Sequence, residues 1–288
     1  TMANLKEIRN RIASVSSTMQ ITSAMKMVSA AKLKKAQDAI TAMRPYATTL
    51  TTLIQNLSST LDGDIQNPYT QIRDTQKVLI VSITSNRGLC GAFNANIIKR
   101  TRQLILEDYA DKTVSLISIG KKGSELLEKT GKISSTHDAV YDDLNYDSVG
   151  IIAQNIMDQF AAQHYDEVVL VYNRFKNAAT QIVEVEPYLP IVAEAEETDD
   201  VKGDYIFEPS KFEIVNELLP KSLKMQLYKA LRDSFASEHG ARMTAMHKAT
   251  DNATELRDQL KLTYNKARQA AITNEILEIV GGAEALNG

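Results

Sequence analysis

The sequence predicts an α/β fold in which two long terminal helices pair as an antiparallel coiled coil around a central sheet domain. Two observations predict this class. Both ends of the chain carry apolar residues at alternating spacings of three and four, whereas the middle carries Val- and Ile-rich runs separated by amphipathic segments. The expected organisation is an N-terminal helix at 1–62, a central domain at 63–210 and a C-terminal helix at 211–288.

The N-terminal segment keeps its apolar spacing from Leu5 to Leu61 without a slip. A repeat sustained over this length is typical of a left-handed coiled coil and not of a globular surface helix. Pro45 is expected to kink the helix, and the run Asp62-Gly63-Asp64 is expected to end it. The seam positions are Leu5, Ile8, Ile12, Val15, Met19, Thr22, Lys26, Ser29, Leu33, Ala36, Ile40, Met43, Ala47, Leu50, Ile54, Leu57 and Leu61.

The C-terminal segment repeats the pattern, with alanine at many seam positions so that two helix backbones can approach closely. Neither stripe is stable alone in water, so each requires a partner. We expect the two to pair with each other, antiparallel, because the central domain joins them; pairing of each helix with a second copy is the alternative. The seam positions are Met246, Ala249, Ala253, Leu256, Leu260, Thr263, Ala267, Ala270, Asn274 and Leu277.

Between the helices, strands are predicted to alternate with helices, which indicates a mostly parallel, Rossmann-like sheet. Thr180–Val185 is predicted to add an antiparallel edge strand, and the acidic stretch 193–204 an exposed loop. The other predicted strands are Lys77–Ile83, Thr113–Ile119 and Glu167–Tyr172, and the predicted helices are Asn94–Tyr109, Lys121–Thr130 and Asp147–Ala162.

Composition excludes several classes of protein. Charged residues make up 24% of the 288 residues and hydrophobic ones 43%, which is ordinary for a folded soluble chain. No uncharged apolar stretch approaches the roughly 18 residues of a membrane span, and the N-terminus lacks the apolar core of a secretion signal. Cys90 is the only cysteine, which excludes an internal disulfide and a CxxC metal or redox site.

Charge is distributed unevenly along the chain. Residues 1–60 carry eight Lys or Arg and two acidic residues, whereas the formal net charge of the whole chain is −3. A basic arm on an acidic body favours a charged partner, either nucleic acid or an acidic protein surface. Because Tyr46 is the only aromatic side chain of the arm that could stack on bases, the protein surface fits at least as well.

The run Ser85-Asn86-Arg87-Gly88-Leu89-Cys90-Gly91-Ala92-Phe93-Asn94 follows a predicted strand and opens a predicted helix, where a Rossmann domain holds a phosphate. Only two glycines are present, and neither GxGxxG nor GxxxxGK[ST] occurs. A tight turn is therefore favoured over nucleotide binding. Gly120-Lys121-Lys122-Gly123 also lacks the Walker spacing and is expected to be a βα turn.

Other candidate chemistry has a structural explanation as well. Cys90 could be a nucleophile near a helix N-terminus, but no motif places a histidine base beside it. The four histidines form no ligand pair. Glu184 and Glu186 share one strand face, where two solvated carboxylates are favoured over a catalytic pair. We therefore predict no catalytic residue, no cofactor and no metal site, and a mechanical or scaffolding role.

Three segments carry a resemblance to a known family. They are Ile21-Thr22-Ser23-Ala24-Met25-Lys26-Met27-Val28-Ser29-Ala30-Ala31-Lys32-Leu33, Arg87-Gly88-Leu89-Cys90-Gly91-Ala92-Phe93-Asn94, and Ala267-Arg268-Gln269-Ala270-Ala271-Ile272-Thr273-Asn274-Glu275-Ile276-Leu277-Glu278-Ile279-Val280. In this order along the whole chain they resemble the gamma subunit of F-type ATP synthases, bacterial type. Asn86 stands where the family usually has Asp, and His239-Gly240 and Gly281 look atypical. A glycine inside a helix costs about 1 kcal/mol relative to alanine.

The resemblance implies a central rotary shaft and not an enzyme in its own right. Its implied partners are three alpha and three beta subunits, an epsilon subunit and the membrane c ring, with no nucleic acid and no small-molecule substrate of its own. Ion flow through the c ring would turn the shaft and drive ATP synthesis, and hydrolysis would drive the reverse. The implied location is peripheral, on the cytoplasmic face of a bacterial inner membrane.

The resemblance also implies roles for individual residues. Lys26 would contact the acidic lever of a beta subunit, and its alternative is a solvated lysine on a coiled coil. Tyr205 and Glu208 would meet the c ring, and their alternative is domain packing. Arg268, Gln269, Thr273 and Glu278 would contact beta subunits, and their alternative is ordinary surface polarity. An apolar tip would turn in a hydrophobic sleeve; it consists of Ile276, Leu277, Ile279, Val280 and Ala283.

Two rival functions remain open from the residues alone. A Rossmann-type enzyme that dimerises through helical arms would bind nucleotide stoichiometrically. A coiled-coil adaptor on nucleic acid would show strongly salt-dependent binding to DNA or RNA.

Overall fold

The computed structural model describes residues 2–59, 67–191 and 211–287. It divides into two compact units, a helical unit of Thr1–Ser29 with Met243–Gly288 and a central unit of Ala30–Arg242. Two long helices, α1 (Met2–Ser59) and α5 (Lys211–Asn287), contribute to both units. Pro45 lies inside α1, and the expected helix end at 62–64 and acidic loop at 193–204 lie outside the described residues. The boundaries at 62/63 and 210/211 stay a prediction.

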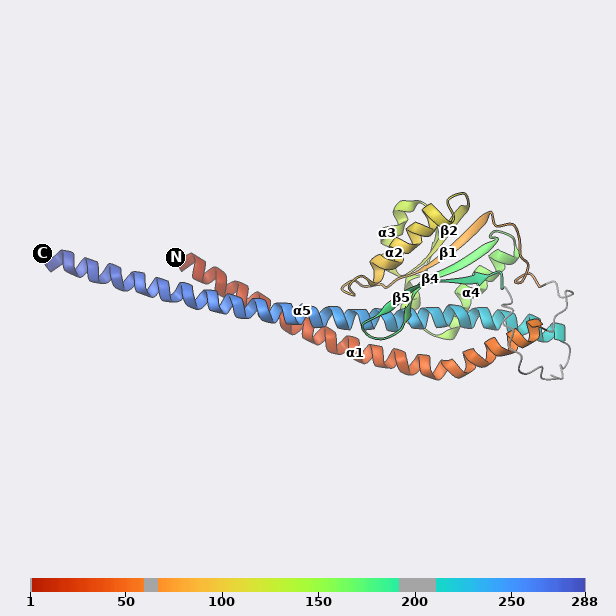
Figure 1. Cartoon of the computed structure of the whole chain (residues 1–288), viewed down its shortest axis with the longest axis horizontal. Helices are drawn as coiled ribbons and strands as arrows, with labels where there is room; N and C mark the ends of the chain where they lie inside the picture. The colour runs from red at the N-terminus through yellow and green to blue at the C-terminus, as the bar shows by residue number, and fades with distance from the viewer. Residues whose placement is uncertain (1, 60–66, 192–210, 288) are drawn as a thin grey trace. The chain divides into compact units, whose positions relative to one another are not determined.

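The central unit contains a five-stranded sheet in the order β3-β2-β1-β4-β5 (Figure 1). The first four strands are parallel, and β5 is antiparallel to β4 at one edge. The mostly parallel Rossmann-like sheet is therefore confirmed. The strands are β1 (Lys77–Ile83), β2 (Thr113–Ile119), β3 (Ile133–Thr136), β4 (Glu167–Phe175) and β5 (Gln181–Leu189).

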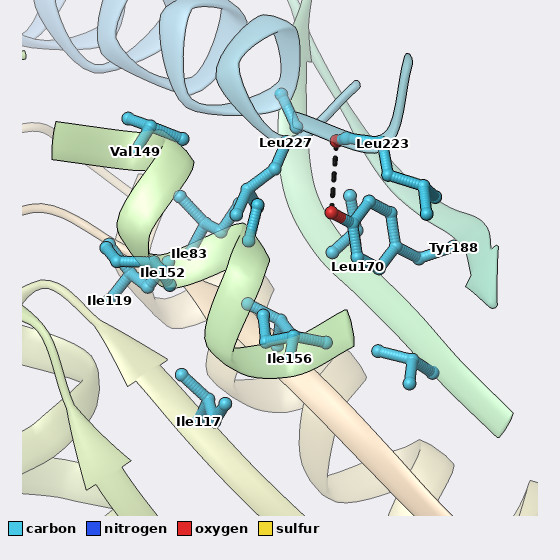
Figure 2. Close-up of a cluster of buried hydrophobic side chains, with 14 of the residues drawn as sticks. Ile83, Ile117, Ile119, Val149, Ile152, Ile156, Leu170, Tyr188, Leu223 and Leu227 are labelled. Atoms are coloured by element: carbon cyan, nitrogen blue, oxygen red, sulfur yellow. Dashed lines mark hydrogen bonds between the residues drawn. The ribbon is translucent and has the colours of Figure 1, made fainter. Parts of the chain in front are cut away.

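Helices cover both faces of this sheet. The helical segments are α2 (Phe93–Gln103), η1 (Leu104–Asp108), α3 (Lys121–Leu127), η2 (Glu128–Thr130), η3 (Asp138–Tyr141) and α4 (Tyr146–Ala161). Alternate residues of β1 point to opposite faces, so Ile80 packs with α2 and α3 while Val81 packs with α4 and α5. Figure 2 shows Tyr188 of β5 among these side chains, its hydroxyl donating to the carbonyl oxygen of Leu223 on α5 at 3.0 Å.

Most predicted elements of the central unit are confirmed. β1 and β2 begin and end at the predicted residues, and β4 runs three residues further than predicted. The helix expected at 94–109 is α2 continued by the π-helical η1. β3 was missed, because its sequence Ile-Ser-Ser-Thr has one apolar residue and pairs with β2 only through an irregular register.

The second half of α1 packs on α5 in the central unit. Leu33 and Ala36 are buried, and Leu50 forms a small apolar cluster with Leu219 and Met225. These contacts run antiparallel, since Arg44 lies near Asp233 and the later Tyr46 lies near the earlier Lys221. Both long helices thus contribute to the core of the central unit.

Candidate functional site

In the helical unit, α1 and α5 lie side by side and antiparallel. The hydroxyl of Thr250 donates to that of Thr22 at 2.8 Å. Three residues earlier on α1, the sulfur of Met19 accepts from Thr254 at 3.3 Å and from Arg257 at 3.5 Å. The chain's own two ends are therefore partners, as expected.

The seam predicted for α1 is confirmed at every described position, because each of those side chains is buried or half-buried. The seam predicted for α5 is wrong at alternate positions. Met246 and Ala253 are buried, but Leu256 is 46% exposed. Ala249 is half-buried as predicted, and the errors begin at Leu256. At Leu256, Thr263 and Ala270 the next residue along is the less exposed one, and these residues are Arg257, Tyr264 and Ala271. The pattern misled because Arg257 and Tyr264 carry polar ends on stems that pack well in a seam.

Beyond this seam α5 continues past the start of α1 (Figure 1). With Thr22 opposite Thr250, the register puts Met2 opposite about residue 270, so later residues have no helix beside them. Asn274 and Leu277 are accordingly exposed, not seam residues. Large apolar side chains at this end are at least half exposed; they are Ile272, Ile276, Leu277, Ile279 and Val280. Exposed apolar residues gathered in one place mark an interaction surface.

The residues predicted to contact beta subunits fall in two separate places. Lys26 is half-buried on α1, opposite about residue 246. Arg268 lies some 22 residues along α5 from that point, which is about 33 Å of helix. Arg268 and its predicted companions Gln269, Thr273 and Glu278 are exposed, as is Ala283. Tyr205 and Glu208 lie outside the described residues.

Sequence reasoning missed a second apolar surface on α1, which lies away from the seam. Ile21, Met27 and Val28 are all more than half exposed. Ile21 and Val28 are one heptad apart and off the seam, so a second apolar stripe was visible in the sequence. Lys26 is a seam position, so the stripe of Ile21 and Val28 lies on the other side of α1 from it.

In the central unit, the loop after β1 is tied together by its own side chains. The amide oxygen of Asn94 accepts from the backbone N–H of Ser85 at 2.9 Å, and its amide nitrogen donates to the Ser85 hydroxyl at 2.8 Å. Leu89 and Gly91 both have left-handed backbone angles, with φ of 61° and 60°. Asn86 joins this loop to its neighbours, because it accepts from the N–H of Lys121 at 2.9 Å and donates to the carbonyl of Asp138 at 2.8 Å.

A buried ion pair of α5 holds the same loop from outside. The guanidinium of Arg242 donates to the carbonyl oxygens of Arg87 at 3.1 Å and Gly88 at 3.2 Å. It also pairs with Glu238 at 2.6 Å, and both residues are 7% exposed. Burial raises the pKa of Glu238, and the positive charge of Arg242 opposes that rise. No motif had suggested this clamp.

These contacts weaken the candidate chemistry of the loop. The Cys90 thiol is buried, and burial raises its pKa, which disfavours the thiolate that a nucleophile requires. The N–H groups that open α3 are already bonded, since Lys122 donates to the Ser85 carbonyl and Gly123 to the Thr84 hydroxyl. In the turn that opens α3, protein groups thus take the positions where a phosphate would need free donors.

The two strand carboxylates are not simply solvated, which corrects the interpretation favoured from sequence. Glu184 and Glu186 are half-buried. Arg174 donates to Glu184 at 2.8 Å, while Tyr172 and Gln226 both donate to Glu186. Glu184 therefore links β5 to β4, and Glu186 links the β4–β5 hairpin to α5.

Few features outside these two regions resemble a binding site in the described part of the chain. Within 2–59, 67–191 and 211–287, no group of three His, Cys, Asp or Glu side chains is placed to hold a metal ion. Over the same ranges, no helix is long and apolar enough to cross a membrane. An open groove of about 400 Å³ between β3 and α4 contains one titratable side chain, His137, whose pKa burial lowers.

Comparison with known proteins covers the whole chain. A family model described as ATP synthase matches residues 4–286. The ATP synthase gamma chain of Flavobacterium johnsoniae is 68% identical over 287 residues and covers 100% of both chains. A chain of the Tetrahymena thermophila mitochondrial ATP synthase central stalk and c ring is 28% identical, with a TM-score of 0.62 over 80% of this chain and 99% of that one.

A third comparison supports the fold alone. A chain from the Euglena gracilis mitochondrial ATP synthase, in a structure of its OSCP, F1 and c ring, has a TM-score of 0.73 at 24% identity. It covers 99% of this chain and 95% of that one.

Proposed function

The chain belongs to the ATP synthase gamma chain family, and we propose that it is the central rotary shaft coupling ion flow through a membrane c ring to ATP synthesis or hydrolysis. The observation that carries the proposal is the exposed apolar end of α5, in a chain that matches a gamma chain along its entire length. Apolar contacts are non-directional, so such a surface can turn inside a sleeve without breaking specific bonds.

Catalysis belongs to other subunits in this proposal. In the loop after β1, the Ser85 N–H and the Gly88 carbonyl are bonded to protein groups, and the Cys90 thiol is buried. The nucleotide would be bound by alpha and beta subunits, three of each, which surround the helix pair. The asymmetric shaft would force the three beta sites through different conformations in turn.

Two contact zones follow from the placement of the charged residues. Lys26, half-buried on α1, would meet the acidic lever of a beta subunit. Arg268 and Gln269, with Thr273 and Glu278 nearby, would meet a beta loop close to the apolar tip. Because about 33 Å of helix separates the zones, each can respond to a different part of the surrounding ring.

The foot of the shaft would be the region around Tyr205 and Glu208, with the c ring and the epsilon subunit as partners. The chain would then be peripheral, on the cytoplasmic face of a bacterial inner membrane. The 68% identity to the gamma chain of a bacterium supports this location.

Torque places a physical demand on the shaft. One elementary charge crossing 100 mV releases about 2.3 kcal/mol, so several must be pooled for each ATP. The shaft must hold that energy as twist without local unfolding. Two paired helices resist twist better than one, and the Arg242 clamp ties α5 to the sheet domain at a buried point.

The test is an affinity pull-down of the tagged chain from its native membrane, followed by native mass and ATPase measurements. A particle of three alpha subunits, three beta subunits and one copy of this chain that hydrolyses ATP is expected. A lone chain or homodimer that binds nucleotide would favour the Rossmann-type enzyme instead. Strongly salt-dependent capture of DNA or RNA would favour the nucleic-acid adaptor.

A further inference from the structure

The β4–β5 hairpin contacts α5 through polar side chains that have no part in the proposed rotary function. Glu186 on β5 accepts hydrogen bonds from the Tyr172 hydroxyl and, at 2.8 Å, from the amide of Gln226 on α5. The same amide donates to the carbonyl of Pro187 at 3.0 Å. Glu186 therefore receives two side-chain hydrogen bonds, one from the hairpin and one from the helix.

Asp233 lies two turns further along α5 and is only 9% exposed. Lys229 of α5, Arg174 of β4 and Arg44 of α1 attract its negative charge, whereas Glu186 repels it. Tyr172 faces it as well. Within the described ranges, no hydrogen bond or ion pair is formed by the carboxylate of Asp233.

The cations around Asp233 compensate its charge incompletely. Arg174 donates its Nε to Glu184 at 2.8 Å, so its charge is shared with another carboxylate. Burial is the largest influence on Asp233 and raises its pKa to about 6. The carboxyl group thus changes charge within the range where cells work, and the change occurs between three packed elements.

We propose that Asp233 makes the contact of the β4–β5 hairpin with α1 and α5 a proton-responsive joint. The hairpin packs more stably on the helices when the Asp233 carboxyl is neutral, because no buried charge then loses solvation or repels Glu186. This contact is less stable when the carboxyl is ionised. This inference concerns the chain by itself and does not depend on the rotary function.

The first test compares the full-length chain with Asp233→Asn by urea unfolding between pH 4 and pH 8. The Asn side chain stays neutral, so the ratio of the variant's folding constant to that of the unaltered chain should grow by on the order of 100-fold as pH rises. The matched control is Asp111→Asn, which removes an exposed carboxylate and should leave this ratio unchanged. Growth of less than threefold for Asp233→Asn would overturn the proposal.

A second measurement locates the effect and needs no variant. Hydrogen exchange of Gln181–Leu189, corrected for the intrinsic pH dependence of exchange, should show less protection at pH 7.5 than at pH 5. Equal protection at both values would overturn the joint even if global stability changed. Carbon NMR of the Asp233 carboxyl should give a midpoint near 6, and a midpoint near 4 would exclude the proposed titration.

Discussion

Gly240 of α5 lies against the backbone of Ala178 in the turn between β4 and β5. A Cβ at position 240 would approach the Ala178 carbonyl oxygen to 3.1 Å and its Cα to 3.2 Å. The glycine that looks out of place in a helix thus allows two backbones to pack closely. The close packing of Gly240 against the hairpin offsets the unfavourable helix propensity of glycine.

Gly240→Ala should therefore destabilise the chain, although alanine is the better helix former. The propensity gain is about 1 kcal/mol, and overpacking against fixed backbone costs about 1 to 3 kcal/mol. We expect a net loss of about 1 kcal/mol in urea unfolding. The control is Gly150→Ala on α4, where the Cβ would meet only the Lys224 side chain at 3.7 Å. A stabilised Gly240→Ala variant would show that the turn moves aside freely.

Asn86→Asp should also destabilise, because a carboxylate cannot donate to the Asp138 carbonyl that the amide nitrogen of Asn86 now contacts. Loss of that donor should cost about 1 to 3 kcal/mol at pH 7. The deficit should shrink at pH 4, where a protonated carboxyl can donate again. Asn155→Asp on the exposed face of α4 retains its acceptor for Gln159 and serves as the control. Equal stability of Asn86→Asp and the unaltered chain at pH 7 would contradict this role.

Arg242→Met should be among the most damaging single changes in the central unit. It leaves Glu238 buried without its partner and removes the donors to Arg87 and Gly88, for which about 3 to 5 kcal/mol is expected. Adding Glu238→Gln should restore part of the loss, since the unpaired charge is then gone. A double variant no more stable than Arg242→Met would assign the whole loss to the loop carbonyls.

His239 should make stability fall in acid. Burial, with the charges of Arg242 and Lys32, lowers its pKa to about 3, well below the value of about 6.5 in an unfolded chain. The unfolded chain therefore takes up the proton first, so this contribution to stability is complete above pH 6.5 and is lost as pH falls toward 3. Between pH 7 and pH 4, the free energy of unfolding should fall by about 2 to 3 kcal/mol less in His239→Gln than in the unaltered chain, as measured by urea unfolding at each pH. The control is His247→Gln at an exposed position, which should not change the loss of stability at low pH.

Charge reversal tests the two contact zones in the assembled complex. Lys26→Glu and Arg268→Glu should each reduce ion pumping per ATP hydrolysed, because each would place a negative charge where an acidic or polar beta surface is expected. Lys129→Glu, an exposed change on η2, is the control. Coupling that stays normal in both variants would remove Lys26 and Arg268 from the set of contacts.

The sequence predicted the regular elements well and the contacts between them less well. Buried strands such as β1 are unbroken Val and Ile runs, so their bounds follow from composition alone. The seam of α5 was misassigned because Arg257 and Tyr264 pack through their stems while the pattern favoured Leu256. Pairwise features such as Arg242 on the Gly88 carbonyl leave no periodic trace, because they depend on residues 154 positions apart.

Some residues of the candidate site were predicted from the sequence pattern and others were not. The apolar end of α5 was visible in the sequence and is exposed, but the off-seam stripe of Ile21 and Val28 was overlooked. That stripe could have been found by asking which apolar residues the seam leaves out. The clamp and the hairpin joint bring together residues far apart in the sequence, so no sequence pattern predicted them.

The bond between Thr22 and Thr250 also sets an order of events during biosynthesis. Its partners are separated by 228 residues, and ribosomes add about 5 to 20 residues per second. The first helix must therefore wait about 10 to 45 s after emerging before its partner exists. Throughout that delay its apolar seam is unsatisfied and open to chaperones or to neighbouring nascent chains. Slowing translation of the final helix should increase aggregation even though no residue of the finished protein has changed.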